Sequence, residues 1–269
     1  VALRLERLRL GERKTSDAQL ARLLETDEHF ALPGMDIVAS GFELYGRRLG
    51  RLSLQARNEG GLWWLDSLSI ANSDARLTGS GRWQPGRAPQ TQLSLNFDIR
   101  DIGAFLARIG YPEVVRDGTA RLSGDLRWRG IPTRIDQATL DGLFRLEAEN
   151  GRFAKLEPGV GRLLGVLSLQ SLPRRLKLDF SDVFSDGFAF DRIAGDGRMQ
   201  AGVLASDNLE IHGPAARIWL AGTASLVEET QDLKVVVQPT LSESVAVGAA
   251  AGLINPVAGV VTYLAQKAL

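Results

Sequence analysis

Apolar and polar residues alternate with a period of two along most of this chain. The stretches Leu93–Ile99 and Ala120–Trp128 show the pattern clearly, with an apolar residue at nearly every second position. Successive side chains of a β-strand point to opposite faces of a sheet, so the pattern predicts strands with one apolar and one polar face. A sheet with one hydrated face is usually antiparallel. Similar alternation occurs at residues 1–5, 50–57, 68–70, 75–78, 176–180 and 232–237.

Short turn sequences separate these predicted strands. Residues 58–61 read Asn-Glu-Gly-Gly, residues 71–74 read Ala-Asn-Ser-Asp, and residues 211–214 read Ile-His-Gly-Pro. Glycine, asparagine, aspartate and proline are the residues that tight turns favour. Strands separated by such turns at intervals of about ten residues are typical of an antiparallel meander.

Four stretches depart from the alternation. The sequence predicts short helices near 16–24, 101–109 and 158–172, and in the second of these Asp101 is placed to cap the helix N-terminus. A helical segment is also predicted over 244–268, where residues as far as Gln266 carry no charge. Three interpretations of this segment are open: short helices packed on the end of the sheet, contact with a membrane, or a span across one.

The chain contains an internal repeat. A shift of 141 residues places residues 46–81 on residues 187–222 without a gap, with identical residues at ten of 36 positions. Self-similarity of this kind is typical of duplicated structural units. The sequence therefore predicts a first β-meander unit over 1–115, with the helices near 16–24 and 101–109. A second unit is predicted over 116–269, with the helix near 158–172 and the C-terminal helical segment.

Composition excludes several kinds of chemistry. The chain has 32 lysines and arginines against 32 aspartates and glutamates, so it lacks the basic excess of most nucleic-acid-binding proteins. It has no cysteine, and this removes disulfides, thiolate metal sites and cysteine nucleophiles; it has two histidines. The glycines of 159–165 do not have dinucleotide-loop spacing, and the aspartates of 179–191 do not have calcium-loop spacing. We therefore expect no enzyme activity, cofactor or metal.

Arginines occupy many polar positions of the predicted strands, and the tryptophans also fall in strands. The arginines are expected to hydrate the polar face and to limit edge-to-edge association, with contact to anionic lipid headgroups as the functional alternative. The tryptophans are expected in the core or at the sheet ends. These residues are Arg51, Arg57, Arg76, Arg82, Arg121, Arg127, Arg129, Trp63, Trp64, Trp83, Trp128 and Trp219.

Several motifs resemble the C-terminal region of the YhdP-type branch of the AsmA-like superfamily. The closest resemblance runs from Leu143 to the end of the chain, and residues 46–83 resemble the hairpin units of the same family. None of the motifs names a binding residue. They are residues 165–175, 187–197, 209–218 and 229–233, together with the glycine- and alanine-rich tail.

The resemblance implies a fold, a location and a function. Members of this family are large envelope proteins of Gram-negative bacteria, anchored in the inner membrane by an N-terminal helix. Their remaining length crosses the periplasm as a long curved β-sheet with an apolar groove that carries phospholipid towards the outer membrane. The chain begins at Val1 without an initiator methionine or leader. We therefore expect a periplasmic segment whose inner-membrane anchor lies outside this sequence.

The expected fold is mostly β with short α-helices: a long antiparallel sheet of meander repeats curved into an open groove or half-barrel, with helices at the ends. The expected partners are phospholipid acyl chains, the rest of the same longer chain, and the outer membrane or its proteins at the C-terminal end; nucleic acid is not expected. Candidate groove residues are Leu93, Leu95, Phe97, Leu122, Leu126, Leu176, Leu178, Leu233 and Val235. Candidate membrane-contact residues are Leu253, Ile254, Val257, Val260, Tyr263 and Leu264.

A second function class fits the same alternation. A structural or assembly factor that affects outer-membrane biogenesis, without catalysis, would bury its apolar strand faces in a closed, packed core. Burial of apolar area drives either arrangement, so alternation alone does not separate an open groove from a sealed core. An enzyme would need a carboxylate pair or a histidine constellation, and the sequence shows neither.

Overall fold

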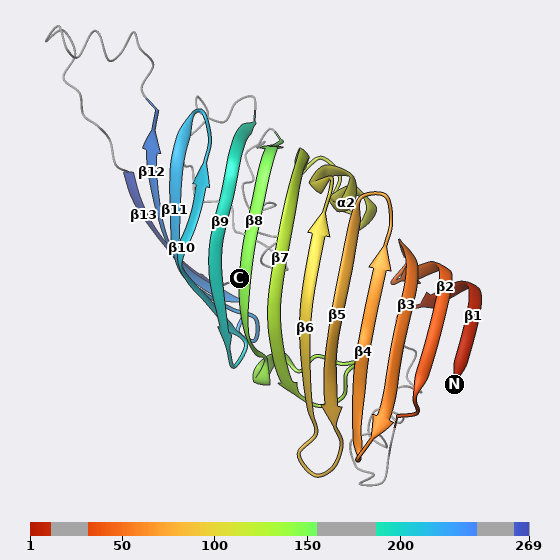
Figure 1. Cartoon of the computed structure of the whole chain (residues 1–269). Coiled ribbons are helices and arrows are strands. Elements are labelled where there is room, and N and C mark those ends of the chain that lie inside the picture. The colour runs from red at the N-terminus through yellow and green to blue at the C-terminus, as the bar shows by residue number, and fades with distance from the viewer. Residues whose placement is uncertain (12–31, 155–186, 241–260, 269) are drawn as a thin grey trace, which may run out of the picture.

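One continuous β-sheet makes up most of the structure. The computed structural model describes residues 1–11, 32–154, 187–240 and 261–268. Within these residues, 13 strands form a single sheet whose order in space follows the order in the chain. The strands lie side by side from red to blue in Figure 1, with β1 and β13 at the two edges. The predicted mostly-β meander is confirmed.

The strands are long, and two short helices interrupt their succession among the described residues. α2 is an α-helix, and η1 is a single turn of 3₁₀-helix. The elements are β1 (Ala2–Leu10), β2 (Met35–Leu44), β3 (Arg47–Glu59), β4 (Leu62–Ala71), β5 (Ala75–Gln84), β6 (Gln90–Ile99), α2 (Ile102–Arg108), β7 (Val115–Arg129), η1 (Gln137–Thr139), β8 (Asp141–Phe153), β9 (Phe188–Gln200), β10 (Val203–His212), β11 (Ala216–Ser225), β12 (Thr230–Pro239) and β13 (Val261–Ala268).

Strand pairing is antiparallel from β2 to β13, whereas β1 pairs with β2 in parallel. In the parallel pair, Ala2 lies beside Asp36 and Leu10 lies beside Leu44. A parallel pair needs a long connection between its strands, and residues 11–34 separate β1 from β2. The period-two pattern predicts the strand but not the direction of its partner, so the sequence analysis expected an antiparallel neighbour here.

Two hairpins illustrate how the turns are made. Gly60 and Gly61, between β3 and β4, have φ angles of 62° and 77°. Ala201 and Gly202, between β9 and β10, have φ angles of 47° and 76°. Two-residue turns with positive φ at both positions match the twist of the strands that they join.

The repeat of 141 residues also appears in the strand boundaries. β3, β4 and β5 begin and end 141 residues before β9, β10 and β11, respectively. The hairpin Gly60–Gly61 thereby corresponds to Ala201–Gly202. The division into units 1–115 and 116–269 itself stays a prediction, because the described strands form one sheet without a break between β6 and β7, where the boundary would fall.

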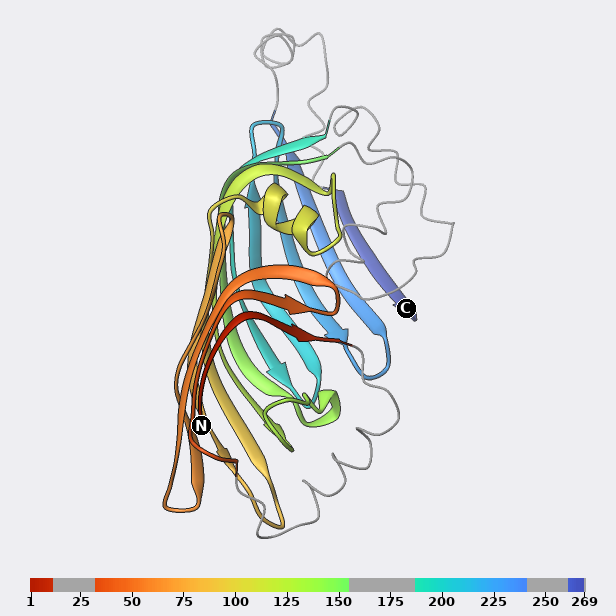
Figure 2. The ribbon, with the colours of Figure 1, turned by 90° about the vertical axis from the view of Figure 1, so that its right-hand side faces the viewer.

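The helix predicted over 101–109 is confirmed as α2. Asp101 caps it, and its carboxylate accepts a hydrogen bond from the backbone N–H of Ala104 at 2.8 Å. Gly110 follows the helix with a φ angle of 98°, a conformation that favours glycine. Figure 2 shows that α2 lies in the hollow of the curved sheet.

The C-terminal prediction is partly wrong. Residues 261–268 form strand β13, which pairs with β12 from Val261 opposite Val237 to Ala268 opposite Thr230. The uncharged, alanine-rich composition suggested a helix, but the edge of β12 offers a row of backbone partners to an adjacent strand. Residues 244–260 and the helices predicted near 16–24 and 158–172 lie outside the described residues.

Candidate functional site: an apolar groove

The apolar residues of successive strands lie opposite one another and form continuous rows across the sheet. Leu77 of β5 faces Phe97 of β6, which in turn faces Leu122 of β7 and then Leu146 of β8. Residues directly opposite in an antiparallel pair point to the same face. The candidate residues Leu93, Leu95, Phe97, Leu122 and Leu126 therefore share one face of β6 and β7.

The same face continues to the C-terminal strands. Ile193, Ile211, Ile218 and Val237 form one row across β9 to β12, and this row continues from Ala148 of β8. Val235 and Leu233 lie two and four residues before Val237, so they point to the same face. All groove candidates within the described residues thus lie on one side of the sheet, while Leu176 and Leu178 lie outside those residues.

This apolar face is the concave one. Phe105 of α2 packs edge-on against Phe97, with ring centroids 4.9 Å apart and an interplanar angle of 79°. Because α2 lies in the hollow of the sheet in Figure 2, Phe97 and the other residues of its face point into the hollow. We call the three central rows of the concave face of β5 to β9 the groove floor. It holds only leucine, phenylalanine, methionine and glycine: Leu77, Gly79, Gly81, Leu93, Leu95, Phe97, Leu122, Gly124, Leu126, Gly142, Phe144, Leu146, Gly195, Gly197 and Met199.

The groove floor is bounded by buried residues near the strand ends. In β5, β6 and β7 the buried residues are Ala75 and Val115 at one margin and Trp83, Thr91 and Trp128 at the other. Between the margins, the residues of the floor are half-buried, except Met199 of β9, which is buried. Three rows of side chains separate the margins, and they extend about 14 Å along the strands at 3.4 Å per residue.

Packing is dense at both margins. At one, the Trp128 indole donates to the carbonyl oxygens of Ile131 at 3.2 Å and Arg134 at 2.9 Å. The Thr91 hydroxyl donates to Gly130 O at 2.8 Å. At the other, Ile102 and Leu106 of α2 pack on a buried cluster from β7 to β12. The buried members of that cluster are Val115, Ala148, Phe188, Phe190, Ile193, Ala216, Ile218 and Val237.

The opposite face of the sheet is polar and carries cross-strand ion pairs. Arg121 pairs with Asp98 at 2.9 Å, and Arg145 pairs with Asp196 at 2.9 Å. The hydrogen bond from Arg145 and a second one from Asn208 lower the pKa of the Asp196 carboxyl. All seven arginines predicted on polar strand positions are exposed. Three of the tryptophans, Trp63, Trp83 and Trp128, are buried.

A broad hollow also occurs on the polar side. It is lined mainly by polar-face residues of β4 to β9, among them Arg82, Gln92, Arg127 and Asp141. Arg127 pairs with Asp141 at 2.9 Å, and the Arg82 guanidinium donates to the amide oxygen of Gln92 at 2.9 Å. These contacts within the hollow leave no concentration of one charge there, so it does not resemble an anion site.

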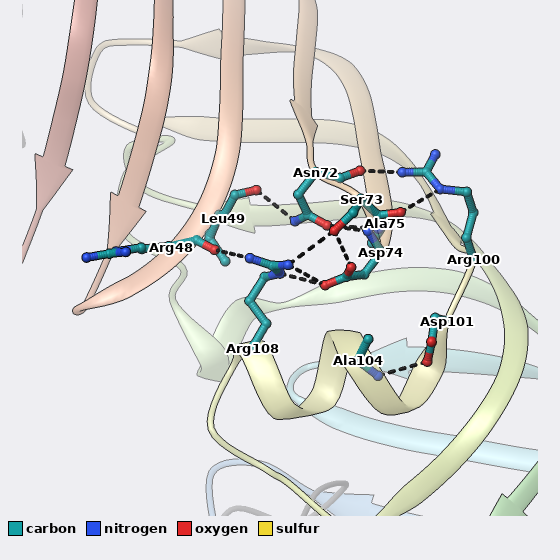
Figure 3. Close-up of polar contacts among 10 residues, drawn as sticks. All are labelled: Arg48, Leu49, Asn72, Ser73, Asp74, Ala75, Arg100, Asp101, Ala104 and Arg108. Carbon is teal, nitrogen blue, oxygen red and sulfur yellow. Dashed lines mark hydrogen bonds and ion pairs between the residues drawn. The ribbon is translucent and has the colours of Figure 1, made fainter.

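A polar cluster fixes α2 to the sheet. Figure 3 shows Arg108, from the last turn of α2, reaching the turn between β4 and β5. Its Nε donates to Oδ2 of Asp74 at 2.7 Å, and its Nη2 lies 2.6 Å from the same oxygen. On the other side of the turn, Arg100 donates to the carbonyl oxygens of Ser73 and Asn72.

Asp74 is the acidic centre of this cluster and is 8% exposed. A hydrogen bond from the Ser73 hydroxyl, followed by the bond from Arg108 and the nearby charge of Arg100, holds the pKa of Asp74 below its usual value. The carboxylate is therefore charged at neutral pH, and it is a structural link between α2 and the β4–β5 turn.

No metal or histidine centre was found where the chain is described. Those residues contain no group of three or more histidines, cysteines, aspartates and glutamates that could hold a metal ion. His212 contacts Glu210 at 2.6 Å at the end of β10, and His29 lies outside the described residues. No helix in the described part of the chain is long and apolar enough to cross a membrane.

The sequence placed the groove candidates of the described strands on one face of the sheet, but it did not indicate which face is concave or what bounds it. Alternation identified the apolar positions, because each strand carries its own pattern. It did not identify Asp74 and Arg108, which are 34 residues apart in sequence and meet only after α2 folds back over the sheet. The membrane-contact candidates Leu253, Ile254, Val257 and Val260 lie outside the described residues, whereas Tyr263 and Leu264 lie in β13.

An open single-layer sheet with an apolar concave face defines a protein with an elongated hydrophobic groove. The chain belongs to the YhdP family, because the family model described as YhdP protein matches residues 1–269. It is 32% identical over 228 residues to the intermembrane phospholipid transporter YhdP of Escherichia coli (strain K12). That match covers 84% of this chain and 18% of the relative's length. No solved structure matches the chain.

Proposed function

We propose that the groove floor binds the acyl chains of phospholipids and lets them move along the sheet between two membranes. The observation that carries this proposal is the composition of the floor, which holds leucine, phenylalanine, methionine and glycine across five adjacent strands. The name of the E. coli relative as an intermembrane phospholipid transporter supports the proposal.

The physical basis is the burial of apolar area. Each Å² of apolar surface removed from water contributes about 25 cal/mol, whether a second sheet or an acyl chain covers it. The groove rows run across the strands, and every position along the floor is apolar or glycine. A chain that slides from one strand to the next exchanges similar contacts, and movement needs no catalytic residue.

We propose further that this segment works in the periplasm as part of a longer chain, with its C-terminal end towards the outer membrane. The chain's match to part of a much longer relative supports the longer chain. The headgroups would stay hydrated at the open side of the groove. Contact of residues 253–264 with the outer membrane, or with its proteins, belongs to the same proposal.

The alternative of an assembly factor with a closed, packed core is not favoured. Such a core would cover the apolar face with a second layer of protein. In the described residues the floor of β5 to β9 is half-buried apart from Met199, and α2 covers one margin of it and packs on Phe97.

The test is lipid loading of the purified chain. The protein is incubated with vesicles of phosphatidylethanolamine and phosphatidylglycerol, separated from them, and examined by native mass spectrometry and lipid extraction. We expect bound phospholipid in the unaltered chain and a large loss in Leu95→Asp. An acyl chain on the floor would take the charged carboxylate out of water, which costs free energy. A lipid-free chain that takes up none from vesicles contradicts the proposal.

A matched control lies one residue away. Asn96 points to the polar face of the same strand and is exposed. Asn96→Asp adds the same charge at almost the same place in the sequence, so it should leave loading unchanged. Equal loss of lipid in both variants would show that the charge acts on folding or net charge rather than on the groove.

A further inference from the structure

Glycines and large residues alternate along the centre of the groove floor. Across β5 to β9, Gly79 faces Leu95, Leu95 faces Gly124, Gly124 faces Phe144, and Phe144 faces Gly197. This row crosses the strands and therefore runs along the groove. Every large side chain in it has a glycine on each side.

The large side chains lean over the neighbouring glycines. A Cβ atom at Gly79 would lie 2.6 Å from Cδ2 of Leu95, and one at Gly124 would lie 2.8 Å from Cδ1 of Phe144. The Cβ atoms of residues directly opposite in a sheet are about 4.5–5.5 Å apart. The side-chain ends of Leu95 and Phe144 are thus displaced sideways, into the space that a neighbouring side chain would otherwise fill.

The next row of the floor repeats the arrangement. A Cβ atom at Gly81 would meet the carbonyl oxygen of Gln92 first and would lie 2.6 Å from Cδ2 of Leu93. One at Gly142 would lie 2.6 Å from the carbonyl oxygen of Asp125 and 2.9 Å from Cδ2 of Leu126. Two independent rows therefore contain leucines that lie across glycines of the adjacent strand. The same relationship on both rows indicates a property of the floor rather than of one contact.

A positive φ angle does not explain these glycines, although at Gly81 and Gly142 the backbone of the adjacent strand also leaves little room for a side chain. Gly79, Gly81, Gly124 and Gly142 all lie outside the positive-φ region that favours glycine. Glycine weakens a strand because it loses more conformational entropy and has no side chain to pack. In these strands the missing side chain provides space, and that space is filled from the neighbouring strand.

We propose that these glycines lower the groove floor and thereby determine how wide a lipid the groove accepts. With the leucine and phenylalanine side chains lying sideways, the open depth above the floor accommodates the two acyl chains of a diacyl phospholipid. A methyl group at the glycine positions forces the large side chains upright into the groove. This inference rests on the proposed lipid-binding function and assigns the glycines a part in lipid selection.

The test compares a two-chain with a one-chain lipid. Gly79→Ala and Gly124→Ala are combined, and loading is measured with dioleoyl phosphatidylethanolamine and with its one-chain lyso form. We expect diacyl loading to fall about tenfold, as overpacking of a fitted space does, while lyso loading stays near that of the unaltered chain. A lost fold would lower both, and circular dichroism monitors it.

A second pair of variants makes the test independent of folding defects. Adding Leu95→Ala and Phe144→Ala to the glycine variant removes the displaced side chains, so diacyl loading should recover.

Gly197→Ala is the single change that disturbs the central row least. Its Cβ would lie 3.1 Å from Cδ1 of Leu204 and 3.8 Å from the nearest backbone oxygen. The matched control is Gly41→Ala in β2, whose Cβ would lie 3.4 Å from its nearest neighbour.

The outcomes separate this inference from the proposed function. Unaltered diacyl loading in the glycine variants, with lipid present in the unaltered chain, overturns the inference and leaves the proposed function intact. Equal losses of both lipids without recovery in the combined variant also overturn it. If the unaltered chain binds neither lipid, the proposed function fails, and the inference fails with it.

Discussion

Arg108 and Asp74 join the helix that covers the groove margin to the sheet beneath it. The guanidinium Nε donates to the Asp74 carboxylate at 2.7 Å, and the two side chains are 29% and 11% exposed. The contact connects α2 to the turn between β4 and β5. Its partial burial distinguishes it from the ion pairs of the polar face, and this difference makes it testable.

Asp74→Ala is expected to lower the free energy of unfolding by about 2–3 kcal/mol, because it leaves the Arg108 guanidinium partly buried without its charged partner. Urea denaturation followed by circular dichroism measures the change. Asp98→Ala is the control, since the Asp98–Arg121 pair is 49% and 70% exposed and should contribute less than about 1 kcal/mol. Similar losses in the two variants would contradict a special role for Asp74.

The same carboxylate predicts a dependence of stability on pH. The pKa of Asp74 is lower in the folded protein than in the unfolded chain, owing first to the Ser73 hydrogen bond and then to Arg108. Its contribution is therefore complete above the unfolded value of about 3.9 and is lost as pH falls through the folded pKa. The difference in unfolding free energy between the unaltered chain and Asp74→Asn should stay constant from neutral pH to about pH 5 and shrink below about pH 4. A constant difference down to pH 2 would contradict this assignment.

The sequence predicts the strands well because each carries its own period-two pattern. Residues 93–99 and 120–128 fall within β6 and β7, and their apolar positions share the face that alternation indicates. The helix at α2 is also local, since Asp101 and the apolar residues after it lie within one short stretch. Which residues share a face of the sheet was thus predictable residue by residue, whereas which of the two faces is concave was not.

Features that depend on distant partners were not predictable. The parallel direction of β1 is set where it pairs with β2, and alternation carries no record of strand direction. Strand β13 forms because the edge of β12 is available, although its composition suggested a helix. The glycines of the floor have no recognisable role in the sequence, because only the register places each beside a large side chain.

The buried indole of Trp128 gives a prediction about the opposite margin. Trp128→Phe keeps an aromatic ring but leaves the carbonyl oxygens of Ile131 and Arg134 without their shared donor, so we expect a loss of about 2 kcal/mol. Trp63→Phe removes one such bond, to Pro33 O at 3.1 Å, and should cost less. Thermal and urea unfolding of both variants test the order, and a larger effect at Trp63 would contradict it.

Removal of residues 261–269 is expected to promote association between molecules. The deletion exposes the backbone edge of β12 beside Val235, Val236 and Val237, and an apolar unpaired edge favours pairing with another chain. Light scattering at constant protein concentration measures the rate. Val236→Lys in the shortened chain places a charge on the new edge and should slow association, and equal rates with and without it would contradict the edge explanation.

Phe105 provides a prediction that links stability to the groove. Its ring packs edge-on against Phe97 at 4.9 Å, so Phe105→Ala should lower the free energy of unfolding by about 1–2 kcal/mol through lost aromatic and apolar contact. The same change uncovers Phe97 and widens the open strip of the floor. Lipid loading per folded molecule should therefore stay equal or rise while stability falls. Leu95→Asp lowers loading by placing a charge on the floor, so the two variants separate a margin residue from a floor residue. A loss of loading in Phe105→Ala, measured on protein confirmed as folded by circular dichroism, would instead assign the Phe105 ring to lipid contact.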